Sequence, residues 1–212
     1  MATTKKAWST REKLDRENSV TRARLLRAAR SVFERRGYAR TTVADITAAA
    51  EVSRATFYVY FASKEDVFAV LAAEVRDGFL NAQELTGLDA GDPHAVARAT
   101  VSAYLDAYVE HLAFITVLQH QAITDPDMYA LWEAIHSHPR RRTVRYIEQA
   151  TAAGLAAPVA PPEVVATASG GMIAAFAPAV ANDPADRDEI VSHLVTMYLG
   201  LLGITPEAPS IA

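Results

Sequence analysis

Residues 51–66, EVSRATFYVYFASKED, concentrate side chains that can contact a polyanion. Phe57, Tyr58, Tyr60 and Phe61 lie within five residues, and Arg54 precedes them. A helix this short cannot bury four rings. Helical projection turns Val52, Phe57 and Phe61 inward and leaves an outer face. That face holds Arg54, Ala55, Thr56, Tyr58, Val59 and Tyr60.

The outer face is suited to a DNA groove, because exposed apolar patches mark contact sites. Arg54 can pair with two acceptors on a guanine edge, and Ala55 and the Thr56 methyl suit a thymine methyl. The rings of Tyr58 and Tyr60 can lie along deoxyribose while their hydroxyls reach phosphate oxygens. The alternative is that the tyrosines pack on a neighbouring helix and Arg54 is a solvated helix end.

Three polar residues at expected helix starts complete the predicted DNA-binding set, because helix N-termini favour phosphate. They are Thr42, Ser53 and Lys64. The distribution of charge supports this prediction. Residues 1–64 hold 14 Lys and Arg against 6 Asp and Glu, and the remaining residues hold 7 against 19, which gives the net charge of −4. A basic N-terminal part on an acidic body favours a polyanionic partner for the former.

The sequence gives little support for an enzymatic activity. There is no cysteine, which excludes thiol nucleophiles and cysteine-based zinc sites. The residues of His136-Ser137-His138 lie two apart and point in different directions on a helix, and no His-Glu-x-x-His pattern accompanies them. We therefore expect no enzyme, no metal and no cofactor. Arg140, Arg141, Arg142 and Arg145 are interpreted as a solvated basic face.

The elements that must position these residues read as helices, so the expected fold class is all-α, with about nine helices. Apolar spacing predicts a helix over 21–36, and a capping box predicts a short helix after Thr42. Three Asp-Pro pairs, at 92–93, 125–126 and 183–184, are typical of an N-cap followed by proline at the first helical position. The predicted organisation is a flexible arm (1–17), a helix-turn-helix domain (18–63) and a helical bundle (64–205).

Export and membrane insertion are not expected. The N-terminal residues lack the apolar run of a secretory signal. Residues 164–181 carry no charge over 18 residues, but they are rich in small side chains and lack flanking Lys or Arg, which favours a buried helix over a membrane span. A cytoplasmic location is therefore expected.

GYARTTVADITAAAEVSRATFYVYFASKEDVF, which begins at Gly37, resembles the DNA-binding signature of the TetR family of transcriptional regulators. The positions that match the signature are Gly37, Thr41, Thr42, Ile46, Val52, Ser53, Thr56, Phe57, Tyr58, Tyr60, Phe61, Ser63, Lys64 and Glu65. Two positions depart from it. Glu51 stands where the family usually has glycine in the turn, and a positive φ there would strain it. Val59 stands where many members carry Lys, Arg, His or Trp.

The resemblance implies a C-terminal domain that dimerises and binds a small effector. Small residues on the helices expected at 162–181 and 185–202 suit close packing across a homodimer, although burial within one subunit fits the same periodicity. The candidates for an effector pocket are Tyr104, Tyr108, Phe114, Gln119, Trp132, Met172 and Phe176. Such aromatic stripes also occur in ordinary cores. No anchor for an acidic group is identifiable.

The function implied is that of a sequence-specific regulator on double-stranded DNA. The resemblance favours a repressor released from a palindromic operator by a small apolar or aromatic ligand. The alternative is a helical protein–protein adaptor, or a ligand-binding protein, that does not bind DNA.

Overall fold

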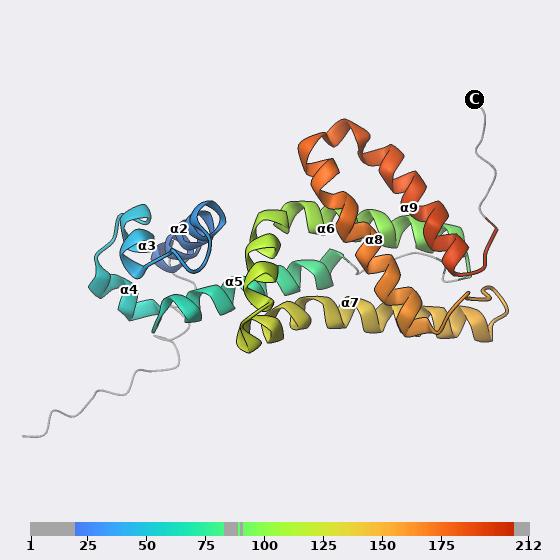
Figure 1. Ribbon diagram of the computed structural model, residues 1–212, viewed down its shortest axis with the longest axis horizontal. Helices are drawn as coiled ribbons and strands as arrows, with labels where there is room; N and C mark the ends of the chain where they lie inside the picture. The colour runs from blue at the N-terminus through green and yellow to red at the C-terminus, as the bar shows by residue number, and fades with distance from the viewer. Residues whose placement is uncertain (1–19, 83–88, 90, 206–212) are drawn as a thin grey trace, which may run out of the picture. The chain divides into compact units, whose positions relative to one another are not determined.

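The computed structural model describes residues 20–82, 89 and 91–205, and within these ranges it is helical without strands. The predicted arm, 1–17, lies outside the described residues. The helices are α2 (Val20–Arg36), α3 (Val43–Ala49), α4 (Arg54–Tyr60), α5 (Lys64–Ala82), α6 (Pro93–Ala122), α7 (Pro126–Ala152), α8 (Pro162–Asn182), the short 3-10 helix η1 (Pro184–Asp186) and α9 (Arg187–Leu201). The all-α fold class is confirmed, and Figure 1 traces the helices.

The N-terminal unit is built on a core of aromatic rings. Phe33 of α2 packs edge-on against Phe68 of α5, with ring centroids 5.0 Å apart, and Tyr38 stacks on Phe33 at 5.6 Å. Phe57 of α4 and Phe61, which follows it, are also buried, at 0% and 3% exposure. The inward prediction for these two residues is confirmed.

Side-chain caps define where the helices begin, as the sequence predicts. The Thr42 hydroxyl accepts from the Asp45 N–H at 3.2 Å, and the Asp45 carboxylate accepts from the Thr42 N–H at 2.9 Å, which completes a capping box on α3. Asp92 and Asp125 cap α6 and α7, each with proline at the start of the helix. The third Asp-Pro pair caps η1, and α9 follows from Arg187 rather than from 185.

The C-terminal unit is a bundle in which α6 packs against α7, α8 and α9, and α7 and α9 each pack against α8. Pro139 lies inside α7 and Pro178 inside α8, yet both helices continue through them. The segment before α8 also holds the end of α9, because Ala157 and Val159 donate backbone hydrogen bonds to Leu202 and Leu201 at 2.9 and 3.1 Å.

Compact packing divides the chain after Ala72, inside α5, rather than at the predicted boundary near Ser63. The reason is that the first turns of α5 belong to the N-terminal core: Val67, Phe68 and Leu71 are buried. The remainder of α5 packs with the C-terminal unit, where Phe79 contacts Tyr104 at 5.1 Å between ring centroids.

Two helices, α6 and α8, are long and apolar enough to cross a membrane. Length and composition are weak evidence for a span, since core helices of soluble proteins have both. Half of the relevant window of α6 is buried, but only 33% of that of α8. Thus α8 leaves more apolar surface uncovered within one subunit than the expected buried helix would.

Candidate functional site

The helix α4 presents one buried and one exposed face. Phe57 is fully buried, whereas Tyr58 is 56% exposed and Val59 is 49% exposed. Arg54 and Ala55 are exposed at its start, and Arg54 has no ion-pair partner among the described residues. The predicted contact side chains therefore stand on an open surface.

Thr56 and Tyr60 are less accessible than the helical projection suggests, since both are half-buried. Thr56 is held at the start of the helix by Ser53. The Ser53 hydroxyl oxygen accepts from the Thr56 N–H at 3.0 Å, and the two hydroxyls lie 2.8 Å apart. Ser53 thus has a structural role as the N-cap of α4, in addition to any contact with a partner.

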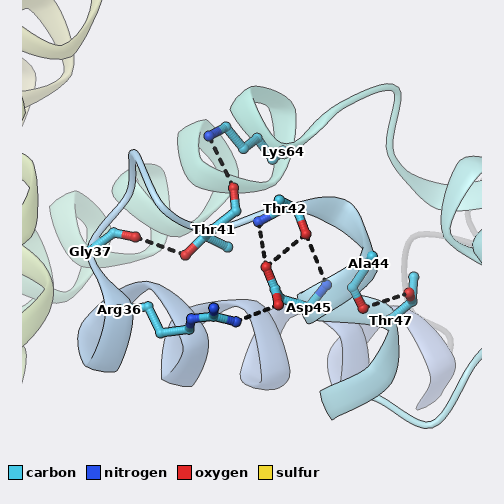
Figure 2. A network of polar contacts seen from close by, with 8 residues as sticks. All are labelled: Arg36, Gly37, Thr41, Thr42, Ala44, Asp45, Thr47 and Lys64. Atoms are coloured by element: carbon cyan, nitrogen blue, oxygen red, sulfur yellow. Dashed lines mark hydrogen bonds and ion pairs between the residues drawn. The ribbon is translucent and has the colours of Figure 1, made fainter.

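The sequence predicts that Thr42 offers a hydroxyl and an N–H to phosphate, but in the structure the Asp45 carboxylate accepts hydrogen bonds from both. The Thr42 hydroxyl donates to the Asp45 carboxylate at 2.7 Å, and Arg36 pairs with the other carboxylate oxygen (Figure 2). Hydrogen bonds from the Thr42 side chain and backbone, followed by the Arg36 charge, hold the pKa of Asp45 below its usual value. A phosphate that bound Thr42 would therefore have to compete with Asp45 for the Thr42 hydroxyl and N–H.

Lys64 also has internal partners. Its ammonium donates to the carbonyl oxygens of Tyr38 and Thr41, each at 3.1 Å, and lies 4.4 Å from the centre of the Tyr38 ring. Figure 2 shows the bond to Thr41, whose hydroxyl in turn donates to the Gly37 carbonyl at 2.8 Å. Lys64 therefore fastens the loop between α2 and α3 to the start of α5, and its expected phosphate contact stays a proposal.

The turn between α3 and α4 contains a strained residue. Glu51 has φ of +52°, and it is the one non-glycine residue in the left-handed region among those described. A side chain in this region costs roughly 1–2 kcal/mol, which glycine avoids. The strain expected from the sequence is therefore present.

Replacing Glu51 with glycine is expected to raise the free energy of unfolding of the N-terminal unit by up to about 1 kcal/mol, because the gain from relieved strain exceeds the added chain entropy. Urea unfolding followed by circular dichroism measures the change. Glu51→Ala is the matched control, since it removes the carboxylate but keeps Cβ. Equal stabilisation by alanine would show that charge, not backbone strain, is responsible.

A cavity of about 520 Å³ lies within the C-terminal unit, between α6, α7, α8 and α9. This volume falls in the range of small-molecule sites. Of the seven residues predicted for a pocket, four line it: Tyr104, Tyr108, Gln119 and Trp132. The lining continues with small residues of α8, among them Ala166, Gly170 and Ala174.

The other three predicted pocket residues do not line the cavity. Phe114 lies fully buried in the helical core. Met172 is half-buried, and Phe176 is 39% exposed on the outside of α8. Sequence spacing identifies a helix face, but it does not distinguish the wall of a cavity from a core contact or from an uncovered outer face.

Sequence reasoning missed His136 and Arg140, both of which line the cavity. The Nδ1 atom of His136 lies 2.7 Å from the Trp132 carbonyl oxygen, and its Nε2 atom lies 2.9 Å from the Tyr108 hydroxyl. A carbonyl only accepts, so Nδ1 carries the proton and Nε2 accepts from Tyr108. Burial raises the pKa of Tyr108 to about 12, which keeps that hydroxyl protonated.

Burial lowers the pKa of His136 below its ordinary value of 6.5. Because the unfolded chain then binds a proton more readily than the folded chain, the free energy of unfolding is expected to fall as pH drops below 6.5. Tyr108, Glu133 and Arg140 are the other titratable groups that face the ring. The urea concentration at the midpoint of unfolding should change more between pH 7.5 and pH 5.5 in the wild type than in the His136→Gln variant. An equal difference in both would remove His136 as the cause.

No group of three or more His, Cys, Asp or Glu residues in the described ranges is arranged to hold a metal ion. His136 instead belongs to the hydrogen-bonded wall of the cavity, and His138 is exposed.

The geometry defines a class: a helix-turn-helix unit whose second helix has an exposed face, followed by a helical bundle with a cavity between its helices. Residues 25–71 match the family model described as bacterial regulatory proteins, tetR family. A crystal structure of a tetR-family bacterial regulatory protein from Rhodococcus RHA1 aligns with 89% of this chain and 100% of its own, with a TM-score of 0.72 and 25% identity. Residues 25–71 are thus similar to the DNA-binding part of the TetR family, and the fold of the chain is similar to that of a family member.

Curated relatives match over part of the chain. The chain is 33% identical over 98 residues to the HTH-type transcriptional repressor NicS of Pseudomonas putida, a match that covers 46% of each protein. It is 34% identical over 90 residues to the HTH-type regulator YfiR of Bacillus subtilis, which covers 42% of each. The aligned part thus spans less than half the length of these relatives.

Proposed function

We propose that the protein is a sequence-specific DNA-binding regulator of transcription that inserts α4 into a major groove. The observation that carries this proposal is the exposure of Arg54, Ala55, Tyr58 and Val59 above a fully buried Phe57. A short helix with such a face, joined to α3 by a tight turn, has the geometry of a recognition helix. Its place of action is the cytoplasm, and its role is binding rather than catalysis.

The exposed residues are assigned different roles. Arg54 reads base edges through its guanidinium, and Ala55 with the Thr56 methyl contacts thymine methyl groups. Tyr58 and Tyr60 contact the sugar–phosphate backbone. Thr42, Ser53 and Lys64 are assigned to backbone positioning, which combines with the structural hydrogen bonds that each of them makes.

Substitution of Arg54 by alanine is expected to relax base preference at its contact position, at a cost of about 1–3 kcal/mol in specific binding. Tyr58→Phe is expected to weaken binding to all duplexes alike, because a backbone contact carries no sequence information. Titration of the preferred duplex and of scrambled duplexes measures both effects. The assignment of roles fails if neither variant changes affinity.

A homodimer is proposed through the helices predicted at 162–181 and 185–202, observed as α8 and α9. Support comes from apolar side chains that one subunit leaves uncovered: Val164 and Phe176 on α8 are 54% and 39% exposed, and Met197 on α9 is 39% exposed. Two recognition helices related by a twofold axis would read half-sites of a palindrome about 34–36 Å apart.

Control by a small ligand is proposed for the cavity in the C-terminal unit. Tyr104 and Tyr108 line it and contact Phe79 of α5, at 5.1 and 5.4 Å between ring centroids. The same helix begins in the N-terminal core, where Phe68 is buried. A ligand that binds better to the conformation unable to fit DNA would release the protein from its operator. The name of the Pseudomonas relative, a repressor, favours repression over activation.

Selection of bound duplexes from a random pool, followed by sequencing, tests the proposal. The expected result is a palindromic motif whose half-sites are one DNA turn apart, with affinity that falls steeply as salt rises. Recovery of no enriched duplex, even at low salt, would contradict DNA binding. It would favour the second candidate, a helical ligand-binding protein or adaptor, for which the cavity is the supporting observation.

A further inference from the structure

One face of α7 supplies the polar part of the cavity wall. Trp132, His136, Pro139, Arg140 and Thr143 all line the cavity, at helical spacings of three and four residues. The facing residues of α6 and α8 are aromatic, aliphatic or small, with hydroxyls and one amide. Any charged group on a ligand must therefore be matched from α7.

Trp132 contributes a hydrogen-bond donor without a partner. Its indole Nε1 is buried and has no acceptor among the described residues. An indole N–H can only donate, and an unpartnered buried polar group costs about 1–3 kcal/mol. An acceptor atom on a bound molecule would remove that cost.

Arg140 contributes the charge. No Asp or Glu lines the cavity in the part of the chain that the structure describes, and His136 is neutral because burial lowers its pKa. Arg140 is therefore the one charged lining residue at neutral pH. It pairs with Glu133 through Nη2. A guanidinium carries five N–H donors in a planar fork, so donors remain for a second carboxylate.

The surroundings of Arg140 add positive charge. Arg140 also borders a second hollow of about 420 Å³, whose other lining residues include His138, Arg141 and Arg145. One acid, Glu163, lines this hollow. The end of the cavity at Arg140 thus favours an anion, although Glu133 lies beside it.

We propose that the cavity binds an apolar or aromatic carboxylic acid, whose carboxylate pairs with Arg140 and whose acceptor atoms include one for the Trp132 N–H. This inference rests on the ligand-controlled function proposed above and specifies its ligand class. It supplies the anchor for an acidic group that is not identifiable in the sequence, and it replaces the interpretation of Arg140 as part of a solvated face.

The test is isothermal titration calorimetry of the full-length protein with benzoate, 2-naphthoate and biphenyl-4-carboxylate, each compared with its own primary amide. The amide keeps shape and a carbonyl acceptor but lacks the charge. At least one acid is expected to bind 10-fold or more tightly than its amide. The proposal is overturned if no acid of the three binds more tightly than its amide.

Substitutions test which residue is responsible for the preference for the acid over its amide. Arg140→Met is expected to bring acid and amide to equal affinity, and Arg140→Lys is expected to retain part of the difference. Arg142→Met, an exposed arginine on the same helix that lines neither hollow, is expected to leave the preference unchanged. Equal loss in the Arg142 variant would overturn the assignment to Arg140.

Trp132→Phe keeps an aromatic ring and removes the donor, so it is expected to weaken acid and amide alike. Unchanged affinities in this variant would overturn the role of the indole. These titrations contain no DNA, so they fail or succeed independently of the selection experiment. A carboxylate preference in a protein that enriches no duplex would defeat the proposed regulator but not the ligand class.

Discussion

Replacing Phe57 with alanine is expected to lower the free energy of unfolding of the N-terminal unit by about 3–5 kcal/mol, the usual loss for a buried phenylalanine. Phe57 is fully buried, and its ring lies 5.8 Å from that of Phe61. Because natural domains are stable by only about 5–15 kcal/mol, the variant should also lose the proposed DNA binding at elevated temperature. Thermal and urea unfolding monitored by circular dichroism measure the loss.

The adjacent Tyr58 supplies the matched control. Tyr58→Ala removes an equally aromatic side chain that is 56% exposed, so stability should change by no more than about 0.5 kcal/mol. Under the proposed function, DNA binding should nevertheless weaken, because the contact proposed between Tyr58 and the DNA backbone is lost. If Tyr58→Ala unfolds the unit as severely as Phe57→Ala does, the ring is part of the core and the outer face is not a free contact surface.

Replacing Gly203 with alanine is expected to destabilise the C-terminal unit by roughly 3 kcal/mol or more, from overpacking and backbone strain together. Gly203 has φ of +68°, and an added Cβ would lie 2.0 Å from the Ala157 carbonyl oxygen. That oxygen belongs to the backbone segment hydrogen-bonded to the end of α9, so it cannot move without breaking those bonds. Urea unfolding measures the effect.

Gly154→Ala separates the two causes. Gly154 has φ of +71°, but an added Cβ would meet nothing within 4 Å. This variant is expected to lose only the roughly 1–2 kcal/mol of left-handed strain. Similar losses in both variants would mean that the close approach of Ala157 relaxes at little cost, and the packing argument for Gly203 would then be wrong.

The sequence predicts best where a local rule decides. The capping box at Thr42 and Asp45 and the Asp-Pro starts of α6 and α7 follow from hydrogen bonds over two or three residues. The division of the α4 rings into buried and exposed also follows, because a helix must turn one face to its core. The positive φ of Glu51 could be anticipated from the glycine that the family usually has there.

The sequence predicts poorly where a side chain chooses between partners distant along the chain. Nothing near Lys64 indicates that its ammonium binds the carbonyls of Tyr38 and Thr41. The sequence does not distinguish Arg140 from its neighbours Arg141 and Arg142. The packing of α7 does, because Arg140 alone of the three lines the cavity. The prediction of Phe114 as a pocket residue is wrong, because aromatic spacing does not reveal how deeply a ring is buried.

The continuity of α5 has a mechanical consequence. Phe79, which touches the two tyrosines of the cavity wall, belongs to the same helix as Lys64. Over about 15 residues of a straight helix, which rises about 1.5 Å per residue, a tilt of about 5° displaces one end by roughly 2 Å. This displacement exceeds the roughly 0.5 Å over which donor–acceptor distances in hydrogen bonds vary. Under the proposed function, a small tilt of α5 is therefore enough to misalign a base contact.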